Sequence, residues 1–392
     1  MARLRLGLLA GEASGDRLAA GMMAALKEQA EGAGHSLEFV GVGGELMTAQ
    51  GLRGLASIDE LAVNGFYEPV VQLPRLLALL RRLTHELARS DLDAFIGIDF
   101  NVFNFLLEKA LRKRGVRTAH YVSPSVYAWR RGRTRQVARA ADLLLCLFPF
   151  EPGFYAGTGL RAEYVGHPLA DAIAPGQGDA EQGAARAALG LASDGLVVAI
   201  LPGSRSGEVG LMGPVFLATA ALFVQRFPAC QFVIPCVRDK LLAPLEALVA
   251  QHPELDIKIV REDARRALTA ADLALIKSGT STLEAMLLGR PMVVSYRMGK
   301  LSYQLARRLI RSPYVALPNV LAGHALVPEL LQYEGEAPAL AAALEAQWQA
   351  WQQGQGGDLQ TAFTELHTEL RRGADTQAAR CVLGLMHSRA SA

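Results

Sequence analysis

Short continuous apolar runs recur along the chain, and stretches with helical spacing separate them. The first run covers residues 4–9 and leads through a glycine-rich turn into an amphipathic stretch that reaches Lys27. Continuous apolar strands with helices between them are typical of parallel sheets that are covered on both faces. Further strands are expected at residues 38–42, 94–98, 117–122, 142–147, 162–165, 196–201, 230–235, 256–260, 272–276 and 291–296.

A change of composition divides this series in two. Residues 171–192 are rich in Ala, Gly, Gln and Asp, which indicates a linker followed by a short helix. The alternation of strands and helices then begins again, so the sequence predicts two doubly wound α/β domains, residues 1–172 and 173–365. We expect them to face an interdomain cleft, with ligands at the carboxyl ends of both sheets. A helical tail, about residues 366–392, is expected to pack back on the first domain.

Composition excludes several classes of protein. Of the 392 residues, 51% are hydrophobic and 20% charged, which is enough apolar material for two cores and argues against disorder. Forty basic residues stand against 38 acidic ones, so the net charge of +2 does not indicate a nucleic-acid binder. None of the four cysteines forms a CxxC pair, and no apolar run reaches the roughly 18 residues of a membrane span. We therefore expect a cytoplasmic protein whose membrane contact, if any, is peripheral.

The first candidate motif is the turn at residues 10–16, between the first strand and its helix. Strand, glycine turn and helix start are in the right order for a backbone cradle around an anion or a sugar. Ser14, Gly15 and Asp16 are therefore candidates for the acceptor side of a binding site. The alternative is a tight turn in which Ser14 or Asp16 caps the helix.

The second candidate is Asp99, at the carboxyl end of the strand at residues 94–98. Enzymes with α/β folds place catalytic groups there, and a carboxylate could act as a general base toward a hydroxyl group. The alternative is a helix cap. Asp91 and Asp93 spell a DxD pattern, but they lie at the amino end of the same strand, so we do not expect a metal site.

Residues 121–135 combine a strand end, a proline turn, two further aromatic residues and four arginines. Aromatic and Arg side chains together suit sugar stacking and phosphate pairing, which makes this segment a second acceptor-side candidate. A nucleic-acid surface and a solvated basic helix face are the alternatives. The candidates in this segment are Ser123, Ser125, Trp129 and Arg130.

Two loops in the second domain have the pattern of a diphosphate site. Arg205 follows the strand at residues 196–201 and could offset charge on a leaving diphosphate. Residues 277–284 run from small hydroxyl side chains into a helix, which suits phosphate binding through backbone N–H groups, although Ser281 to Glu284 also has capping-box spacing. The donor-side candidates are Gly203, Ser204, Arg205, Ser278, Gly279, Thr280, Ser281 and Glu284.

A leucine stripe with helical spacing runs from Leu73 to Leu87, and arginines border it. Either the helix packs on its own sheet, or it lies at the surface of an anionic bilayer. A second basic and apolar stretch, residues 301–311, could assist. The membrane candidates are Leu73, Leu76, Leu77, Leu80, Arg81 and Arg82.

Eight segments in the same order resemble the lipid-A-disaccharide synthase family, and the resemblance extends from residue 8 to about residue 385. The segments are AGEASGD, HYVSPSVYAWR, PFE, VGHPL, LPGSR, SGTSTLEAML, PMVVSYRM and LPNVLAG. The resemblance implies a GT-B architecture of two Rossmann-like domains. It also implies that Asp99, Arg205 and Asn319 match the family's essential Asp, its essential Arg and the Asn of its LPN motif, so Asn319 joins the donor-side candidates. Asn101 and Val102 stand where the family commonly has Pro-Asp.

The implied reaction is an inverting transfer of 2,3-diacylglucosamine from its UDP derivative to 2,3-diacylglucosamine 1-phosphate, which forms a β-1,6 linkage. It implies no metal and no cofactor, and an enzyme that works at the inner membrane surface. The alternatives on the same scaffold are a 2-epimerase, a transferase with a soluble acceptor, and a non-catalytic UDP-sugar-binding protein. We expect no nucleic-acid partner, and the sequence leaves a homodimer open.

Overall fold

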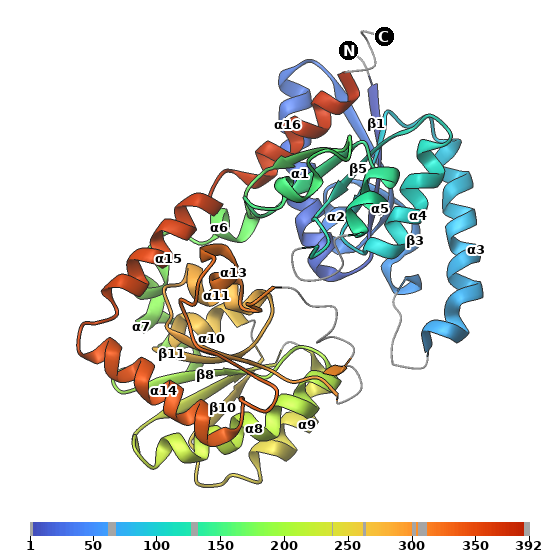
Figure 1. Cartoon of the computed structure of the whole chain (residues 1–392). Coiled ribbons are helices and arrows are strands. Elements are labelled where there is room, and N and C mark those ends of the chain that lie inside the picture. Colours follow the sequence, from blue (N-terminus) through green and yellow to red (C-terminus); the bar gives the residue numbers. More distant parts are fainter. Residues whose placement is uncertain are drawn as a thin grey trace. The chain divides into compact units, whose positions relative to one another are not determined.

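The chain forms two compact units. The computed structural model describes residues 3–61, 68–126, 132–236, 238–261, 264–299, 303–304 and 312–387. One unit comprises Met1–Asp171 and Leu370–Ala392, and the other comprises Ala172–Glu369. Each unit has a twisted parallel sheet with helices packed on it (Figure 1).

The first unit has seven strands in the order β3-β2-β1-β4-β5-β6-β7, and every neighbouring pair is parallel. The chain winds outward from β1 to β3 and then returns to place β4 on the other side of β1. Ligands bind at such a reversal in doubly wound sheets. The strands are β1 Arg3–Ala10, β2 Ser36–Gly43, β3 Leu52–Ser57, β4 Ala94–Ile98, β5 Arg117–Tyr121, β6 Leu143–Cys146 and β7 Arg161–Tyr164.

Two groups of helices cover this sheet. Contacts join α1 with α2 and α16, and join α3 with α4 and α4 with α5 (Figure 1). The apolar sides of α3 and α4 pack with strand residues such as Leu9, Val42 and Phe95 in one core. The helices are α1 Ala13–Gly32, α2 Glu45–Ala49, α3 Glu68–Ala88, α4 Asn101–Arg112, α5 Arg133–Ala140, α6 Pro168–Ala172 and α16 Ala374–His387, with the 3₁₀ turns η1 Ile58–Glu60 and η2 Pro152–Tyr155.

The C-terminal helix α16 belongs to the first unit although it is distant in sequence. Asp171 holds its start, because the carboxylate accepts hydrogen bonds from the N–H groups of Gly373 at 2.8 Å and Ala374 at 2.6 Å. Its flank lies on α1, where Asp375 occupies the space beside Gly21. The Asp171 carboxylate therefore caps α16, and α16 packs on α1, one of the helices that cover the first sheet.

The second unit repeats the design with six parallel strands in the order β10-β9-β8-β11-β12-β13. Its reversal lies between β8 and β11. The strands are β8 Val197–Leu201, β9 Gln231–Pro235, β10 Ile257–Val260, β11 Leu273–Lys277, β12 Met292–Tyr296 and β13 Glu329–Leu331. The helices are α7 Gln177–Leu189, α8 Ser206–Val224, α9 Asp239–Val249, α10 Ala264–Ala270, α11 Thr280–Leu287, α13 Leu317–Ala322, α14 Ala337–Gln352 and α15 Gly357–Leu370.

Helix α8 is the one helix in the described ranges that is long and apolar enough for a membrane span by length and composition. The sequence did not lead us to expect such a helix. Half of its apolar window is buried, and it packs with α9, α14 and the strands in the core of the second unit. A core helix passes the same test, so α8 is weak evidence for a membrane span.

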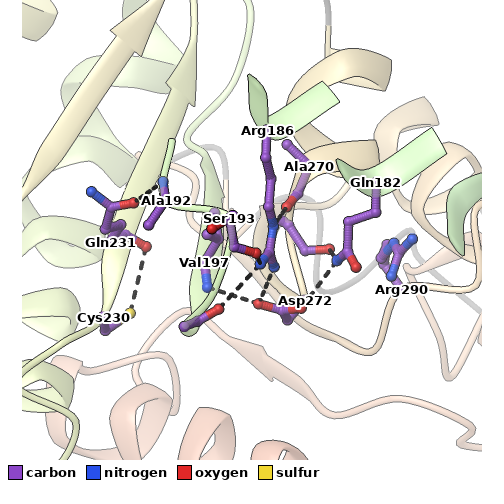
Figure 2. Close-up of polar contacts among 12 residues, drawn as sticks. Gln182, Arg186, Ala192, Ser193, Val197, Cys230, Gln231, Ala270, Asp272 and Arg290 are labelled. Carbon is purple, nitrogen blue, oxygen red and sulfur yellow. Dashed lines mark hydrogen bonds and ion pairs between the residues drawn. The ribbon is translucent and has the colours of Figure 1, made fainter. Parts of the chain in front are cut away.

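Aspartates at the amino ends of strands tie each sheet together. Asp93 accepts a hydrogen bond from the N–H of Arg5 at 2.8 Å, and Asp142 does the same for the neighbouring strand β5. In the second sheet, Asp272 accepts from the first residue of β8 and from Arg186 at 2.6 Å (Figure 2). Asp93, one half of the DxD pattern, therefore has a structural partner in the backbone.

The prediction of a doubly wound, GT-B type α/β fold is confirmed. All eleven predicted strands are present, while β3 and β13, at sheet edges, were missed. The short helix predicted after residue 171 is α7, and the tail is two helices, α15 and α16, that meet near Gly373. Of the second basic stretch, residues 301–311, all but 303–304 lie outside the described residues.

Candidate functional site

The turn after β1 and the turn after β4 lie side by side at the reversal of the first sheet. Ala10 is paired with Ile98, the last residue of β4, and Gly11 and Asp99 follow them. A Cβ atom on Gly11 would collide with the ring of Phe100. Glycine at position 11 therefore lets the first motif approach the residues around Asp99.

The backbone at the carboxyl ends of β4 and β5 is strained. Asp99 and Phe100 both have φ of 46°, and Val122 has φ of 83°. Residues other than glycine rarely adopt positive φ, and for a β-branched residue it is an outlier. Asn104 supports the turn, because its amide donates to the carbonyl of Asp99 at 2.8 Å. Strain of this kind concentrates at functional sites.

Asp99 stands at the end of a chain of polar side chains. Its Oδ1 accepts a hydrogen bond from Asn101 Nδ2 at 3.1 Å, and Asn101 Oδ1 lies 3.2 Å from His120 Nε2. His120 Nδ1 is 2.6 Å from Glu108 Oε1, and both of these side chains are fully buried. Burial raises the pKa of Glu108, and the nearby His120 opposes that rise. Asp99 itself is half-buried at the sheet edge.

The structure corrects the interpretation of the first motif as a self-capped turn. Helix α1 begins at Ala13, so Ser14 and Asp16 are inside it. The Asp16 carboxylate instead accepts hydrogen bonds from three N–H groups at the start of α2, at 2.8–3.1 Å. Gly15 is buried, and a Cβ there would lie 3.3 Å from the Cβ of Ala10. Ser14 is exposed, which leaves its hydroxyl accessible.

The segment after β5 is partly described. Ser123 is 5% exposed, and its hydroxyl lies 2.9 Å from the hydroxyl of Tyr155, while Ser125 is exposed. Trp129 and Arg130 lie outside the described residues. The direct acceptor contact predicted for Ser123 therefore finds its hydroxyl already engaged inside the protein.

The PFE segment contributes a buried carboxyl group. Glu151 accepts hydrogen bonds from the N–H groups of Leu147 and Phe148 at 2.9 and 3.0 Å. Burial raises its pKa to about 8, although these hydrogen bonds favour the charged form. Glu151 therefore holds the turn after β6 in place beside Ser123.

A second pair of turns lies at the reversal of the second sheet, after β8 and β11. Residues 202–205 form the turn after β8, with Gly203 at φ of 127°. Glu208 closes this turn, because its Oε2 accepts from the N–H groups of Ser204 at 3.0 Å and Arg205 at 3.3 Å. The loop is thus fixed by a carboxylate in the first turn of α8.

The same carboxylate joins the two turns. Lys277 Nζ, at the end of β11, lies 3.0 Å from Glu208 Oε1 and 4.9 Å from the ring of Tyr296. Burial acts to raise the pKa of Glu208, but the Lys277 ammonium and the loop N–H groups hold it below its usual value. The Arg205 side chain is 68% exposed, and its guanidinium lies 3.6 Å from the same carboxylate. The Arg205 guanidinium is therefore an accessible cationic group at the end of the loop 202–205.

The alternative interpretation of Ser281 and Glu284 as a capping box is wrong, because Ser281 is not the N-cap. Helix α11 begins at Thr280 with Gly279 as its N-cap, and no side chain caps it. Ser281 therefore lies within the first turn. Ser278 donates to the carbonyl of Val315 at 2.9 Å, which anchors the turn that precedes the helix.

Asn319 is fully buried, and backbone groups and Glu329 use its whole amide. Its Nδ2 donates to Val327 O at 2.9 Å and to Glu329 Oε1 at 2.8 Å. Its Oδ1 accepts from the N–H groups of Leu326 and Val327. These contacts favour a role in positioning the loop around α13 over direct contact with a ligand.

The leucine stripe on α3 divides between core and surface. Leu83 is 0% exposed and packs with Leu79 and Leu87 in the first core, so this half covers the sheet. Leu73 is 51% exposed and Leu77 is 39% exposed. Among the other membrane candidates, Leu76 and Leu80 are half-buried, and Arg81 and Arg82 are exposed, with Arg82 Nη2 3.3 Å from Glu60.

Sequence reasoning missed Glu108, His120 and Glu208 as parts of these sites. A signal existed for two of them: His120 is in the HYVSPS segment, and Glu108 is a charged residue on the apolar side of α4 beside Leu107 and Leu111. Glu208 lies four residues after Ser204, but its hydrogen bonds to the loop became visible only in three dimensions.

Comparison with known sequences gives a consistent result over nearly the whole chain. A family described as lipid-A-disaccharide synthetase matches residues 6–382. A lipid-A-disaccharide synthase from Burkholderia lata is 44% identical over 387 residues, covering 99% of this chain and 97% of its own length. One from Pseudomonas fluorescens is 45% identical over 387 residues, covering 98% and 100%.

Solved structures with low sequence identity share the fold. A putative UDP-N-acetylglucosamine 2-epimerase from Listeria monocytogenes superposes with a TM-score of 0.64 at 14% identity, covering 100% of this chain and 97% of its own. The MurG protein of Acinetobacter baumannii gives 0.54 at 15% identity, covering 99% and 100%. At such identities the likeness concerns the fold alone.

Proposed function

The chain belongs to the lipid-A-disaccharide synthetase family, and on this premise we propose that it is the glycosyltransferase that forms the lipid A disaccharide. It transfers 2,3-diacylglucosamine from UDP-2,3-diacylglucosamine to 2,3-diacylglucosamine 1-phosphate. The products are the β-1,6-linked disaccharide 1-phosphate and UDP. The observation that carries this conclusion is the family match over residues 6–382, with relatives at 44–45% identity along nearly their full lengths.

The second unit is proposed to bind the UDP-sugar donor. The fixed loop at residues 203–205 and the start of α11 flank the reversal of its sheet, where doubly wound folds bind ligands. The accessible Arg205 guanidinium suits a diphosphate, and the first turn of α11, with Thr280 and Ser281, offers N–H groups. We assign Glu284 to the nucleoside. As UDP leaves, these groups offset the negative charge that develops on it.

The first unit is proposed to bind the acceptor and to supply the base. Asp99 takes the proton of the attacking hydroxyl as that oxygen bonds to the anomeric carbon and the bond to UDP breaks. A single displacement of this kind inverts the anomeric centre and needs no nucleophile from the enzyme. Support comes from the position of Asp99 at the sheet reversal and from the strained turn that holds it. The exposed Ser14 and Ser125 are proposed to contact the acceptor.

The exposed half of the α3 stripe is proposed to contact the inner membrane surface. Both substrates carry acyl chains, so an enzyme that meets them at a bilayer needs an apolar surface with basic neighbours. Leu73 and Leu77 are exposed, and the exposed Arg75 and Arg81 share their helix. We expect the contact to weaken with salt, because basic residues near an anionic surface are screened.

Product analysis with purified protein tests the proposed reaction. UDP-diacylglucosamine is incubated with the acylated 1-phosphate, with unacylated glucosamine 1-phosphate, or alone, and the products are identified by mass spectrometry and NMR. The proposal predicts disaccharide and UDP with the acylated acceptor only. Disaccharide from the unacylated sugar would indicate a soluble-acceptor transferase, and a 2-epimer formed from the donor alone would indicate an epimerase.

A further inference from the structure

The polar chain that ends at Asp99 has a fixed direction of proton donation. An ionised carboxylate can only accept, so the amide nitrogen of Asn101 faces Asp99 and its carbonyl faces His120. A carbonyl also can only accept, which requires a proton on His120 Nε2. One further proton is then shared between His120 Nδ1 and Glu108 Oε1, which are 2.6 Å apart.

The buried end of this chain is built into the fold. Glu108 and His120 are both 0% exposed, and the ring of Phe105 packs against His120 at 4.6 Å between centroids. A Cβ atom at Gly97 would collide with Glu108 Oε1 and crowd Asn104. The glycine in the middle of β4 therefore leaves the space that the carboxyl group of Glu108 occupies.

Burying a carboxyl group and an imidazole costs free energy, which the hydrogen bond between Glu108 and His120 offsets in part. In the described part of the chain, neither side chain forms a hydrogen bond to the backbone at a helix end. Their one polar outlet in the described part of the chain is Asn101, and through it Asp99. The chain thus connects a buried proton-holding pair to a half-buried carboxylate at the edge of the sheet.

We propose that Glu108, His120 and Asn101 are positioning residues that fix one oxygen of the Asp99 carboxylate. The inference rests on the proposed role of Asp99 as base. The pair of Glu108 and His120 holds the Nε2 proton toward Asn101, and the Asn101 amide then donates to Asp99 Oδ1. Oδ2, for which the described residues provide no hydrogen bond, is left for the acceptor hydroxyl. The hydrogen bonds through Asn101 depend on its amide side chain. The proline that the family commonly has at position 101 carries no polar side chain and could not form them.

The test is a pH profile of turnover with Asn101→Ala and Asn101→Leu, the second of which keeps the side-chain shape. Val102→Ala is the matched control, since Val102 is the adjacent residue, is 66% exposed and lies outside the network. Position 101 is the first residue of α4 and is only half-buried, so both variants should fold. Thermal unfolding checks this.

The kcat of both Asn101 variants should fall several-fold across the pH profile, because Asp99 Oδ1 loses the hydrogen bond that fixes it, while KM for the donor stays unchanged. Val102→Ala should match the wild type. ¹⁵N NMR should find a proton on His120 Nε2, the ring nitrogen that faces Asn101.

Asp99→Asn, measured in parallel, separates the two claims. If Asp99→Asn is inactive and the Asn101 variants keep the wild-type profile, the positioning network is refuted and the role of Asp99 stands. A His120 that carries its proton on Nδ1 alone also refutes the network. If Asp99→Asn turns over as the wild type does, the proposed base is wrong and the network with it.

Discussion

Glu208 holds the loop of the proposed donor site, so replacing it by Gln should weaken both that loop and the second unit. In the wild type its two oxygens serve Lys277 at 3.0 Å and the N–H groups of Ser204 and Arg205 at 3.0 and 3.3 Å. A Gln side chain has one acceptor oxygen. Its amide nitrogen must then face either the ammonium or the two N–H donors, and both arrangements are unfavourable.

The expected loss lies between two known limits. Breaking a fully buried pair costs about 3–5 kcal/mol, and breaking an exposed one costs less than about 1 kcal/mol. The side chains of Lys277 and Glu208 are 15% and 18% exposed, and Gln retains one acceptor, so we expect about 2 kcal/mol. In a unit of this size that corresponds to a fall in Tm of roughly 4–8 °C. UDP affinity should fall on the order of tenfold if the loop binds the diphosphate.

Calorimetry of unfolding and of UDP binding measures both effects. Glu345→Gln is the matched control, because Glu345 also pairs with an arginine at 3.0 Å in the same unit, but Arg226 in that pair is 69% exposed. The pKa of Glu208 is lowered in the folded state, so its stabilisation is present above the unfolded value of 4.5 and is lost as the pH falls below it. Wild type and variant should therefore converge in acid. A Glu208→Gln protein with the Tm and UDP affinity of the control would refute this reasoning.

Three further predictions concern the membrane, the C-terminal helix and the donor. Leu73→Ser with Leu77→Ser should reduce sedimentation with anionic vesicles at unchanged Tm, whereas Leu83→Ser should lower Tm sharply; the reverse pattern would contradict the membrane contact. Burial raises the pKa of Asp375 from 3.8 to about 6, and the charge of Asp171 adds to this rise. The protein is therefore most stable when Asp375 is protonated, and that stability is lost as the pH rises through 6. Asp375→Asn should therefore raise Tm by about 2–4 °C at pH 8, roughly 1 kcal/mol after allowance for partial exposure, and not at pH 4; scanning calorimetry at both pH values decides it. Arg205→Ala should lower single-turnover rates more than Arg205→Lys, because a planar fork suits a diphosphate better than a point charge does, and equal rates would exclude that role.

The interior strands were predictable because both of their faces are buried, so their residues form continuous apolar runs in the sequence. Two of the four edge strands, β3 and β13, were not. β3 contains Arg53 and Gly54, both exposed, and β13 has three half-buried residues, so neither has that pattern. The start of α8 at Ser206 has no clear helical pattern, because glycines at 207, 210 and 213 and the proline at 214 interrupt it.

The positions of Asp99 and Arg205 after the carboxyl ends of β4 and β8 were predictable, because each residue follows a continuous apolar run. Contacts between distant segments were not, because a local pattern does not report its partner. The sequence around Asp16 suggests a cap for its own helix. In the structure Asp16 caps α2, which begins about thirty residues later. Asn319 reads as a ligand contact, and its amide is used by the loop around it.

The most direct test of the account is single-turnover transfer by wild type and Asp99→Asn, with UDP binding measured on both proteins. The account predicts that the variant folds and binds UDP as the wild type does. Its formation of the disaccharide 1-phosphate should fall by about 10²–10⁴-fold, the usual contribution of a general base. Wild-type rates of disaccharide formation in a folded Asp99→Asn protein would contradict it.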